Sequence, residues 1–305
     1  MLYVSTRNKQ DAYTAHRALC EGTAVDGGCY APFRLPVYAP EYISGLVERS
    51  FGQIVADVLN TFFSTGLTAW NVEIAIGRSH AKIISLGRRT AVCELWHNPG
   101  FSYNYLEQSL YGILTGTSEK PTGWARIAIA VATLFGLFSD LLRAGAEEID
   151  IAETTGDLTL PLAAFYARKM GLPVGRIICS CDEGSAFWDL IQRGERDTAN
   201  CASMASGLER LVFETLGLDG VNDYLTAFES KGLYALEDEQ LSALADGFNV
   251  SAVGAERIDT VISSIQSAND YTIDPVTAHA FGGLQDYRAR TGENRTTVLL
   301  ARSAP

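Results

Sequence analysis

The sequence predicts an α/β fold in which a parallel-rich sheet is flanked by helices. Short apolar runs with the length of buried strands recur at residues 90–96, 149–152, 176–181 and 296–301. Longer segments between them carry apolar residues every three or four positions, as on one face of a helix. Strands that alternate with helices favour a parallel sheet, because a return to the same edge needs a crossover connection.

The clearest unit of this kind is "EEIDIAETTGDLTLPLAAFYARKMGLPVGRIICSCDEG", residues 147–184. It reads as a strand, a loop, a helix, a Gly-Leu-Pro stop, a second strand and an acidic loop. We therefore expect residues 149–152 and 176–181 to form neighbouring parallel strands. The continuous apolar run in "TTVLLARSAP" predicts a closing strand that is buried on both faces.

Helices are expected on both sides of this unit. Ser50 is a suitable cap for a helix over residues 51–62, and a helix over 124–143 ends at Gly145, which suits a left-handed C-terminal position. Further helices are expected at residues 204–216, 221–231, 237–247, 255–267 and 276–290. We expect residues 1–88 to form a small α/β cap, with a strand at residues 82–86, and residues 89–305 to form the core domain.

The composition is that of an ordinary globular protein of 305 residues, 47% apolar and 20% charged. A formal charge of −12 and a pI near 4.8 argue against nucleic-acid and anionic-membrane surfaces. The most apolar stretch, residues 127–138, is shorter than a bilayer of roughly 30 Å requires and indicates a buried helix. The first residues lack the pattern of a signal peptide, so we expect a cytoplasmic protein without nucleic-acid or membrane partners.

The six cysteines show no metal-binding spacing. Cys179 and Cys181 form the closest pair, and alternate residues of a strand face the same way. The simplest interpretation is that they are small buried apolar residues in a reducing compartment. Zinc binding or a redox pair is the alternative interpretation.

A polar corner follows the strand at 90–96, in "CELWHNPGFSYNYLEQ". A strand that feeds a helix through a polar turn is a common position for a small-molecule site in α/β proteins. The neutral hydrogen-bonding candidates of this corner are His97, Asn98, Ser102, Tyr103, Asn104 and Tyr105. They predict noncovalent binding of a polar ligand, and the alternative is a remnant corner filled by its own aromatic side chains.

A second candidate site is the loop before the helix of the βαβ unit. Backbone N–H groups at the start of a helix suit a phosphate or carboxylate, and threonine hydroxyls add donors. The candidates are Thr154, Thr155, Gly156, Asp157 and Thr159. Against such a site, Glu153 and Asp157 place negative charge where the anion would lie. Asp157 is equally well explained as the helix cap, which would satisfy the same N–H groups. Both interpretations stay open.

Several stretches together resemble the threonine synthase family, pyridoxal-phosphate (PLP) enzymes of fold type II, the tryptophan-synthase-β-like fold. They are "YVSTR", "VDGGCYAP", "ELWHNPGFSYNYLEQ", "WARIAIAV", "TTGDLTLPLAAFYARKMGLP", "MASGLERLVFETLG", "YTIDPVTAHA" and "LLARSAP". They occur in the family's order over nearly the whole chain. The resemblance implies the large domain of that fold, with PLP as the ancestral cofactor.

The sequence departs from the family at the chemical positions that the resemblance identifies. Asn104 stands where the family has its Schiff-base lysine, and an amide cannot form an imine. The phosphate loop gains Asp157 and Leu158, and Arg302 aligns with the ring-nitrogen threonine. The family's Asp-Pro-His histidine is Val276, although His279 lies three residues further on.

The family's small domain, which carries its substrate-binding loop, is expected to be missing. Only residues 105–123 separate Asn104 from Trp124, the interval in which the family carries that domain. Among the five lysines, Lys82 is the least unfavourable substitute for the missing one. Lys169 is expected roughly 14 Å along its helix from the phosphate loop, at 1.5 Å per residue.

These observations favour a noncatalytic, threonine-synthase-like protein with no cofactor expected, although noncovalent PLP binding stays open. Its role would be to bind a protein partner or a small anionic or polar ligand at the positions named above, with Arg302. Loss of a covering domain predicts exposed apolar surface and a homodimer. The alternatives are a PLP-dependent synthase or lyase with an unconventional lysine, and a PLP-independent enzyme with a remodelled pocket.

Overall fold

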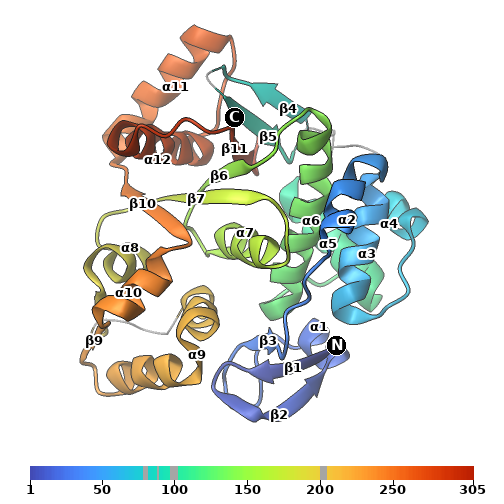
Figure 1. Ribbon diagram of the computed structural model, residues 1–305, viewed down its shortest axis with the longest axis vertical. Coiled ribbons are helices and arrows are strands. Elements are labelled where there is room, and N and C mark those ends of the chain that lie inside the picture. The colour runs from blue at the N-terminus through green and yellow to red at the C-terminus, as the bar shows by residue number, and fades with distance from the viewer. Residues whose placement is uncertain (78–81, 88, 97–101, 200–204) are drawn as a thin grey trace.

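A six-stranded mixed sheet forms the centre of the molecule (Figure 1). The computed structural model describes residues 1–77, 82–87, 89–96, 102–199 and 205–305. The strand order is β10-β7-β6-β11-β5-β4, and β4 is the only antiparallel strand of this described sheet. Its strands are β4 (Lys82–Ser85), β5 (Thr90–Glu94), β6 (Ile149–Thr154), β7 (Val174–Cys181), β10 (Phe248–Ala252) and β11 (Thr297–Ala301).

The predicted fold class is confirmed. Strands β6 and β7 are parallel neighbours, as the βαβ unit predicts, with Ala152 opposite Ile178. Each of the four predicted core strands is present with small shifts of its ends. The sequence did not predict β10, whose "FNVSA" run is short and partly polar, and it placed the 82–86 strand in the N-terminal cap. The structure pairs that strand, β4, with β5 at the edge of the main sheet.

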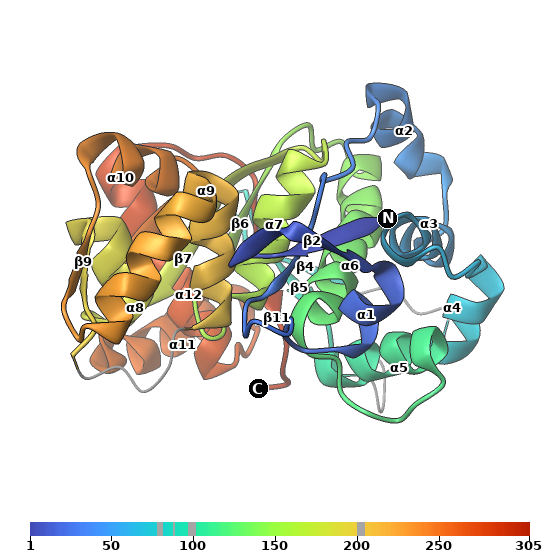
Figure 2. The same cartoon turned by 90° about the horizontal axis from the view of Figure 1, so that it is seen from below.

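The helices cover the sheet on both faces. The longer ones are α3 (Phe51–Phe63), α5 (Tyr103–Thr115), α6 (Gly123–Arg143), α7 (Thr159–Lys169), α9 (Ser206–Glu229), α11 (Ala255–Asn269) and α12 (Pro275–Thr291). The shorter ones are α1 (Ala15–Cys20), α2 (Pro40–Ser44), α4 (Ala69–Ile76), α8 (Ala186–Trp188), α10 (Asp238–Ala245), the 3₁₀ turn Gly45–Glu48 and the π-helical turn Asp189–Arg193. Helices α2 to α5 lie on one side of α6, and α8 to α10 lie at the opposite end of the molecule (Figure 1, Figure 2).

Strand β11 separates two hydrophobic cores. Val298 and Leu300 pack into a large core with α6 and α7, whereas Leu299 and Ala301 pack into a smaller core with α11 and α12. Successive side chains of a strand point to opposite faces, so a strand with helices on both sides must be apolar at every position. The expectation of a closing strand buried on both faces is confirmed.

The N-terminal segment contains its own three-stranded antiparallel sheet, in the order β2-β1-β3. Its strands are β1 (Leu2–Ser5), β2 (Asn8–Thr14) and β3 (Tyr30–Pro32). Tyr3 anchors this sheet to the core: its hydroxyl donates to the Phe62 carbonyl oxygen at 3.0 Å and accepts from Trp124 Nε1 at 3.2 Å. The division of the chain at residue 88 stays a prediction.

The structure revises one helical prediction and confirms another. The helices expected at 204–216 and 221–231 form one helix, α9, which is interrupted at Gly217, where φ is 75° and ψ is −162°. Ser50 caps α3 in a reciprocal arrangement with Gln53, as expected. A further pair of short strands, β8 (Glu195–Asp197) and β9 (Leu233–Ala235), runs antiparallel near the end of α9.

Helix α6 is longer than its most apolar stretch suggested. Among the described helices it alone has the length and composition to cross a membrane, but 83% of its most apolar window is buried inside the protein. It packs against α3 on one side and α7 on the other. We interpret it as the central core helix, in agreement with the expectation from the sequence.

Candidate ligand site at the carboxyl edge of the sheet

A cavity of about 550 Å³ opens where three parallel strands end. Thr154 ends β6, Cys181 ends β7, and Arg302 directly follows β11. Ligands of α/β sheets usually bind at this carboxyl edge. The cavity is lined by Thr154, Thr155, Gly156, Ser180, Cys181, Asp182, Ser185, Ile258, Pro275, Val276, His279 and Arg302. Its volume lies within the usual range of small-molecule sites.

Arg302 is held at this cavity by a loose ion pair with Glu153. Its Nη2 lies 3.4 Å from Glu153 Oε1, and its side chain is 23% exposed. The same Glu153 oxygen accepts from the Thr154 N–H at 3.1 Å and from the Thr154 hydroxyl at 3.3 Å. Glu153 Oε2 is buried without a hydrogen-bond partner. Burial raises the pKa of Glu153 to about 7, against the opposing effect of the Arg302 charge.

A second polar pair lies in the same cavity. His279 Nδ1 and Ser180 Oγ are 2.7 Å apart, and the tautomer of the histidine decides which group donates. His279 Nε2 lies 4.0 Å from Asp182 Oδ1. Burial lowers the pKa of His279, against the opposing effect of the Asp182 charge, and so favours the neutral imidazole. Sequence reasoning noted His279 only for its position after Val276, and it did not select Ser180.

The loop before α7 divides the predicted anion-binding residues between two cavities. Thr154, Thr155 and Gly156 face the larger cavity. Asp157 and Thr159 instead line a cavity of about 240 Å³ on the other side, which is shared with the first residues of α6 and α9.

Asp157 accepts a hydrogen bond from the first N–H group of α7, as the second interpretation of this loop requires, although the N-cap residue itself is Leu158. Its Oδ1 accepts from the Thr159 N–H at 3.1 Å, and its Oδ2 pairs with Arg126. Burial opposes the ionisation of this carboxyl, but the Thr159 N–H and the Arg126 charge outweigh it and hold the pKa of Asp157 below its usual value. Arg126 in turn contacts Glu107 Oε1 at 3.2 Å. Asp157 is therefore already engaged within the protein.

The polar corner is only partly described. His97 and Asn98 lie outside the described residues. The Ser102 hydroxyl accepts from the Tyr105 N–H at 3.1 Å and so caps α5, while Tyr103 is buried and Asn104 is exposed. Ser102, Tyr103 and Asn104 are not among the residues that line the 550 Å³ cavity. The structure thus brings Arg302 together with the loop, but not with Asn104.

The lysines lie away from this cavity. None of its lining residues is a lysine. Lys82 is on the edge strand β4, with its Nζ 3.9 Å from Glu94 Oε2. Lys169 ends α7 and its Nζ lies 3.4 Å from Glu214 Oε2. Among the described residues that line the cavity, there is therefore no side-chain amine that could form an imine with a carbonyl group.

The cysteine pair is buried as expected. Cys179 and Cys181 have free thiols, and burial raises the pKa of the Cys181 thiol to about 11. Within the described part of the chain, no group of three or more histidine, cysteine or acidic side chains is placed to hold a metal ion.

Comparison with known structures defines the class of this fold. A PLP-bound threonine synthase from Brucella melitensis matches with a TM-score of 0.81 at 18% identity, over 100% of this chain and 89% of that chain. A threonine synthase from yeast matches with a TM-score of 0.86 at 15% identity, over 100% of this chain and 87% of that chain. The architecture is that of the fold type II PLP enzymes.

Sequence comparison relates the chain to the threonine synthases. Residues 2–80 match the family model of the threonine synthase N terminus. The threonine synthase of Pseudomonas aeruginosa is 27% identical over 68% of this chain and 50% of its own length. Human threonine synthase-like 1 is 25% identical over 63% of this chain and 28% of its own length. The chain is a homologue of the threonine synthases, and it spans half or less of the length of these curated relatives.

Proposed function

We propose that this chain is a noncatalytic threonine-synthase-like protein that holds a small anionic or polar ligand noncovalently at the carboxyl edge of its sheet. The observation that carries the proposal is the absence of a lysine both at position 104 and in the cavity lining. Imine formation requires an amine within bonding distance of the cofactor aldehyde. The cavity itself, with Arg302 and the Ser180–His279 pair, supports a retained binding role.

The residues present do not fit PLP held in the manner of its PLP-dependent relatives. Asn104 is exposed on α5, and Arg302, the cationic side chain among the described lining residues, is already paired with the Glu153 carboxylate, which a cofactor phosphate bound to Arg302 would meet. At an effective dielectric of about 20, a like-charge pair 4 Å apart costs on the order of 4 kcal/mol. That exceeds what one or two neutral hydrogen bonds of roughly 1 kcal/mol return.

The test is an absorption scan after incubation with PLP, with and without borohydride. We expect the spectrum of free PLP, which gel filtration removes, and no reduced pyridoxyl-lysine in the folded protein. The matched control is Lys82→Arg, which removes the lysine on β4 that the sequence offers as the least unfavourable substitute. A borohydride-fixed adduct at one lysine, lost in its arginine variant and accompanied by threonine formation from O-phosphohomoserine, would overturn the proposal.

The single substitution Asn104→Lys should not restore threonine formation. Asn104 does not line the cavity, and the segment between residues 104 and 124 is too short for the family's substrate-binding domain. The measurement is phosphate release from O-phosphohomoserine with added PLP, with the unmodified chain as control. A yellow, active Asn104→Lys variant would mean that the ancestral site is intact.

A PLP-independent hydrolase is the second candidate, and one contact favours it. The 2.7 Å Ser180–His279 contact has the geometry of a nucleophile and its base. However, Ser180 is completely buried within β7, so a substrate carbon has no access to its hydroxyl oxygen. A fluorophosphonate probe should leave Ser180 unlabelled, and labelling that His279→Gln abolishes would favour the hydrolase.

We further propose that the chain forms a homodimer through exposed apolar residues on α4 and α5. Trp70 and Ile74 occupy one side of α4 and are 62% and 64% exposed, while Tyr105 on the adjoining α5 is 47% exposed. Self-association is a common way to cover such a surface. Light scattering at micromolar concentration should give the dimer mass, and Trp70→Glu should lower it. A monomeric mass for the unmodified chain would contradict this proposal.

A further inference from the structure

We propose that the 550 Å³ cavity takes a small carboxylate with an apolar body, and that its carboxylate replaces Glu153 as the partner of Arg302 so that binding is coupled to protonation of Glu153. The inference rests on the proposed binding function and specifies its ligand. It is carried by the arrangement of Arg302, Glu153 and the apolar start of α12.

Arg302 has capacity for a second acceptor. A guanidinium offers five N–H donors and binds a carboxylate best with two parallel contacts of 2.7–2.9 Å. The contact from Arg302 Nη2 to Glu153 Oε1 is 3.4 Å long and involves a single pair of atoms. Arg302 lines the cavity, whereas Glu153 lies behind it and does not. An incoming carboxylate therefore reaches the guanidinium from the open side.

Glu153 is poorly stabilised as an anion. Its side chain is 2% exposed, and its Oε2 has no hydrogen-bond partner. Arg302 favours its ionised form, as do the N–H and hydroxyl groups of Thr154, while burial and the negative charge of Asp274 oppose it. On the side of β7 it faces the buried Cys179 thiol, whose pKa is raised far above its usual value and which stays neutral. Arg302 is the cationic group that sustains its charge.

The other side of the cavity is apolar. Ile258 from α11 and Pro275 and Val276 from the start of α12 line it, and Val276 is 49% exposed. A ligand body placed there removes apolar surface from water, at roughly 25 cal/mol per Å². His279, which Ser180 holds from behind at 2.7 Å, adds a hydrogen-bonding ring nitrogen to the cavity.

The charges favour a monoanion over a phosphate. Asp182 lies at the rim with a 93% exposed side chain, and Asp274 caps α12 beside the cavity through the Val276 and Thr277 N–H groups. Among the described lining residues, Arg302 supplies the one positive charge that faces these carboxylates and Glu153. A dianionic ligand would leave an uncompensated negative charge in a partly buried site, which is costly. A single carboxylate balances Arg302 once Glu153 is protonated.

This arrangement fixes the sign of the pH dependence. When a ligand carboxylate reaches Arg302, an ionised Glu153 loses its partner and gains a like-charged neighbour, so its protonated form is favoured. Binding and proton uptake are therefore linked, and affinity falls as pH rises through the titration of Glu153. His279 protonates only at lower pH, because burial lowers its pKa, and adds to anion binding there.

The test uses 2-naphthoate as the probe and neutral 2-naphthamide as its matched control. Calorimetric titration should show naphthoate binding that weakens roughly tenfold between about pH 6.5 and about pH 8.5. Near neutral pH, the heat should vary with the ionisation enthalpy of the buffer in the direction of proton uptake. Naphthamide should bind weakly and without this dependence. Equal binding of the two probes, or no naphthoate binding, would overturn the proposal.

The variants separate the roles of the two residues. Glu153→Gln should bind naphthoate several-fold more tightly at about pH 8.5 and lose the dependence on pH above about pH 6.5. A misfolded protein cannot imitate this gain in affinity. Arg302→Gln should lose naphthoate binding. Glu148→Gln, which removes an exposed carboxyl paired with Arg295, should change neither the affinity for naphthoate nor its dependence on pH.

The result also distinguishes this inference from the proposed function. Naphthoate binding without proton uptake, or unchanged by Glu153→Gln, would overturn the inference and leave the noncatalytic role intact. A pyridoxyl-lysine adduct with turnover would overturn the noncatalytic role, whatever naphthoate does.

Discussion

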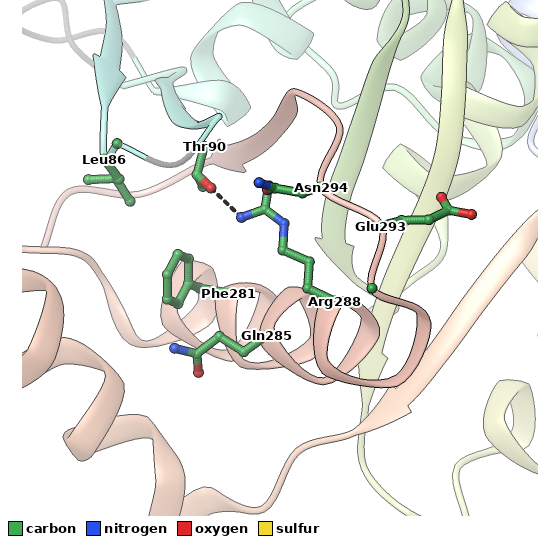
Figure 3. Close-up of a pocket in the computed structure, with 9 residues that line it drawn as sticks. Leu86, Thr90, Phe281, Gln285, Arg288, Glu293 and Asn294 are labelled. Carbon is green, nitrogen blue, oxygen red and sulfur yellow. Dashed lines mark hydrogen bonds between the residues drawn. The ribbon is translucent and has the colours of Figure 1, made fainter.

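The two edges of the parallel sheet each have a cavity with an arginine, and the two arginines are held in opposite ways. At the amino edge, Arg288 lines a cavity of about 410 Å³ and donates to Thr90 Oγ1 at 2.7 Å (Figure 3). It also donates to the Thr297 hydroxyl oxygen at 3.2 Å and to the carbonyl oxygens of Arg89 and Arg295 at 3.3 and 3.1 Å. At the carboxyl edge, Arg302 has the 3.4 Å contact with Glu153.

The difference distinguishes a structural arginine from one that is available to a ligand. Arg288 joins the first residues of β5 and β11 to α12, so its donors are used within the fold. Arg302, in contrast, does not join two secondary-structure elements through several hydrogen bonds; its contact with Glu153 is single and long. A cavity with a charged residue is therefore weak evidence for ligand binding until the partners of that residue have been identified. By this criterion the carboxyl edge is the better candidate site.

The largest effect is expected for Arg288→Gln. The substitution removes hydrogen bonds from a charged donor to two buried threonines and two carbonyl oxygens, so the free energy of unfolding should fall by about 2–3 kcal/mol. Urea unfolding measures it, and naphthoate binding should be unchanged in the folded variant. An unchanged unfolding free energy would make the contrast between the two arginines untenable.

A smaller, pH-dependent effect is expected for Glu153→Gln. Because the pKa of Glu153 is raised from 4.5 to about 7 in the folded chain, its contribution to stability is fully present below about 4.5 and is lost as pH rises through about 7. The glutamine variant does not ionise, so it should be more stable than the unmodified chain by about 1–2 kcal/mol at pH 8. At pH 5, the glutamine variant and the unmodified chain should have similar free energies of unfolding.

Thermal unfolding from pH 5 to pH 8 measures this difference, and Glu148→Gln provides the control for loss of an exposed carboxyl. A stability difference that becomes smaller towards high pH would mean that folding lowers the pKa of Glu153 instead of raising it.

The smallest effect is expected for Arg302→Gln at pH 6, where Glu153 is mostly protonated. Removing a loosely paired arginine should change the free energy of unfolding by less than about 0.5 kcal/mol. Urea unfolding alongside Arg288→Gln measures the contrast directly. A loss as large as that of Arg288→Gln would show that Arg302 is also a structural residue.

The core strands could be predicted from the sequence, whereas the arrangement of side chains around the cavity could not. The strands at 149–154 and 174–181 could be predicted because a strand buried on both faces leaves a continuous apolar run. Strand β10 could not, because Asn249 and Ser251 interrupt its pattern. Arg302 and the threonines of the loop were selected through the resemblance and from helix-terminus chemistry.

The Ser180–His279 contact joins residues 99 positions apart. The packing of α12 across β7 creates it, and neither segment carries a local signal for it. Glu153 was noted only as a charge near the loop, because burial and a missing hydrogen-bond partner are properties of the folded chain.

Helix α6 has a consequence for synthesis of the chain on the ribosome. Its apolar surface is covered by α3, which precedes it, and by α7, which ends 26 residues after Arg143. At roughly 5–20 residues per second, α6 waits a few seconds after its own translation for α7 to be made. During that delay it offers chaperones, and other nascent chains, an apolar helix of 21 residues. Slow translation of residues 144–169 would lengthen this exposure and favour aggregation over folding.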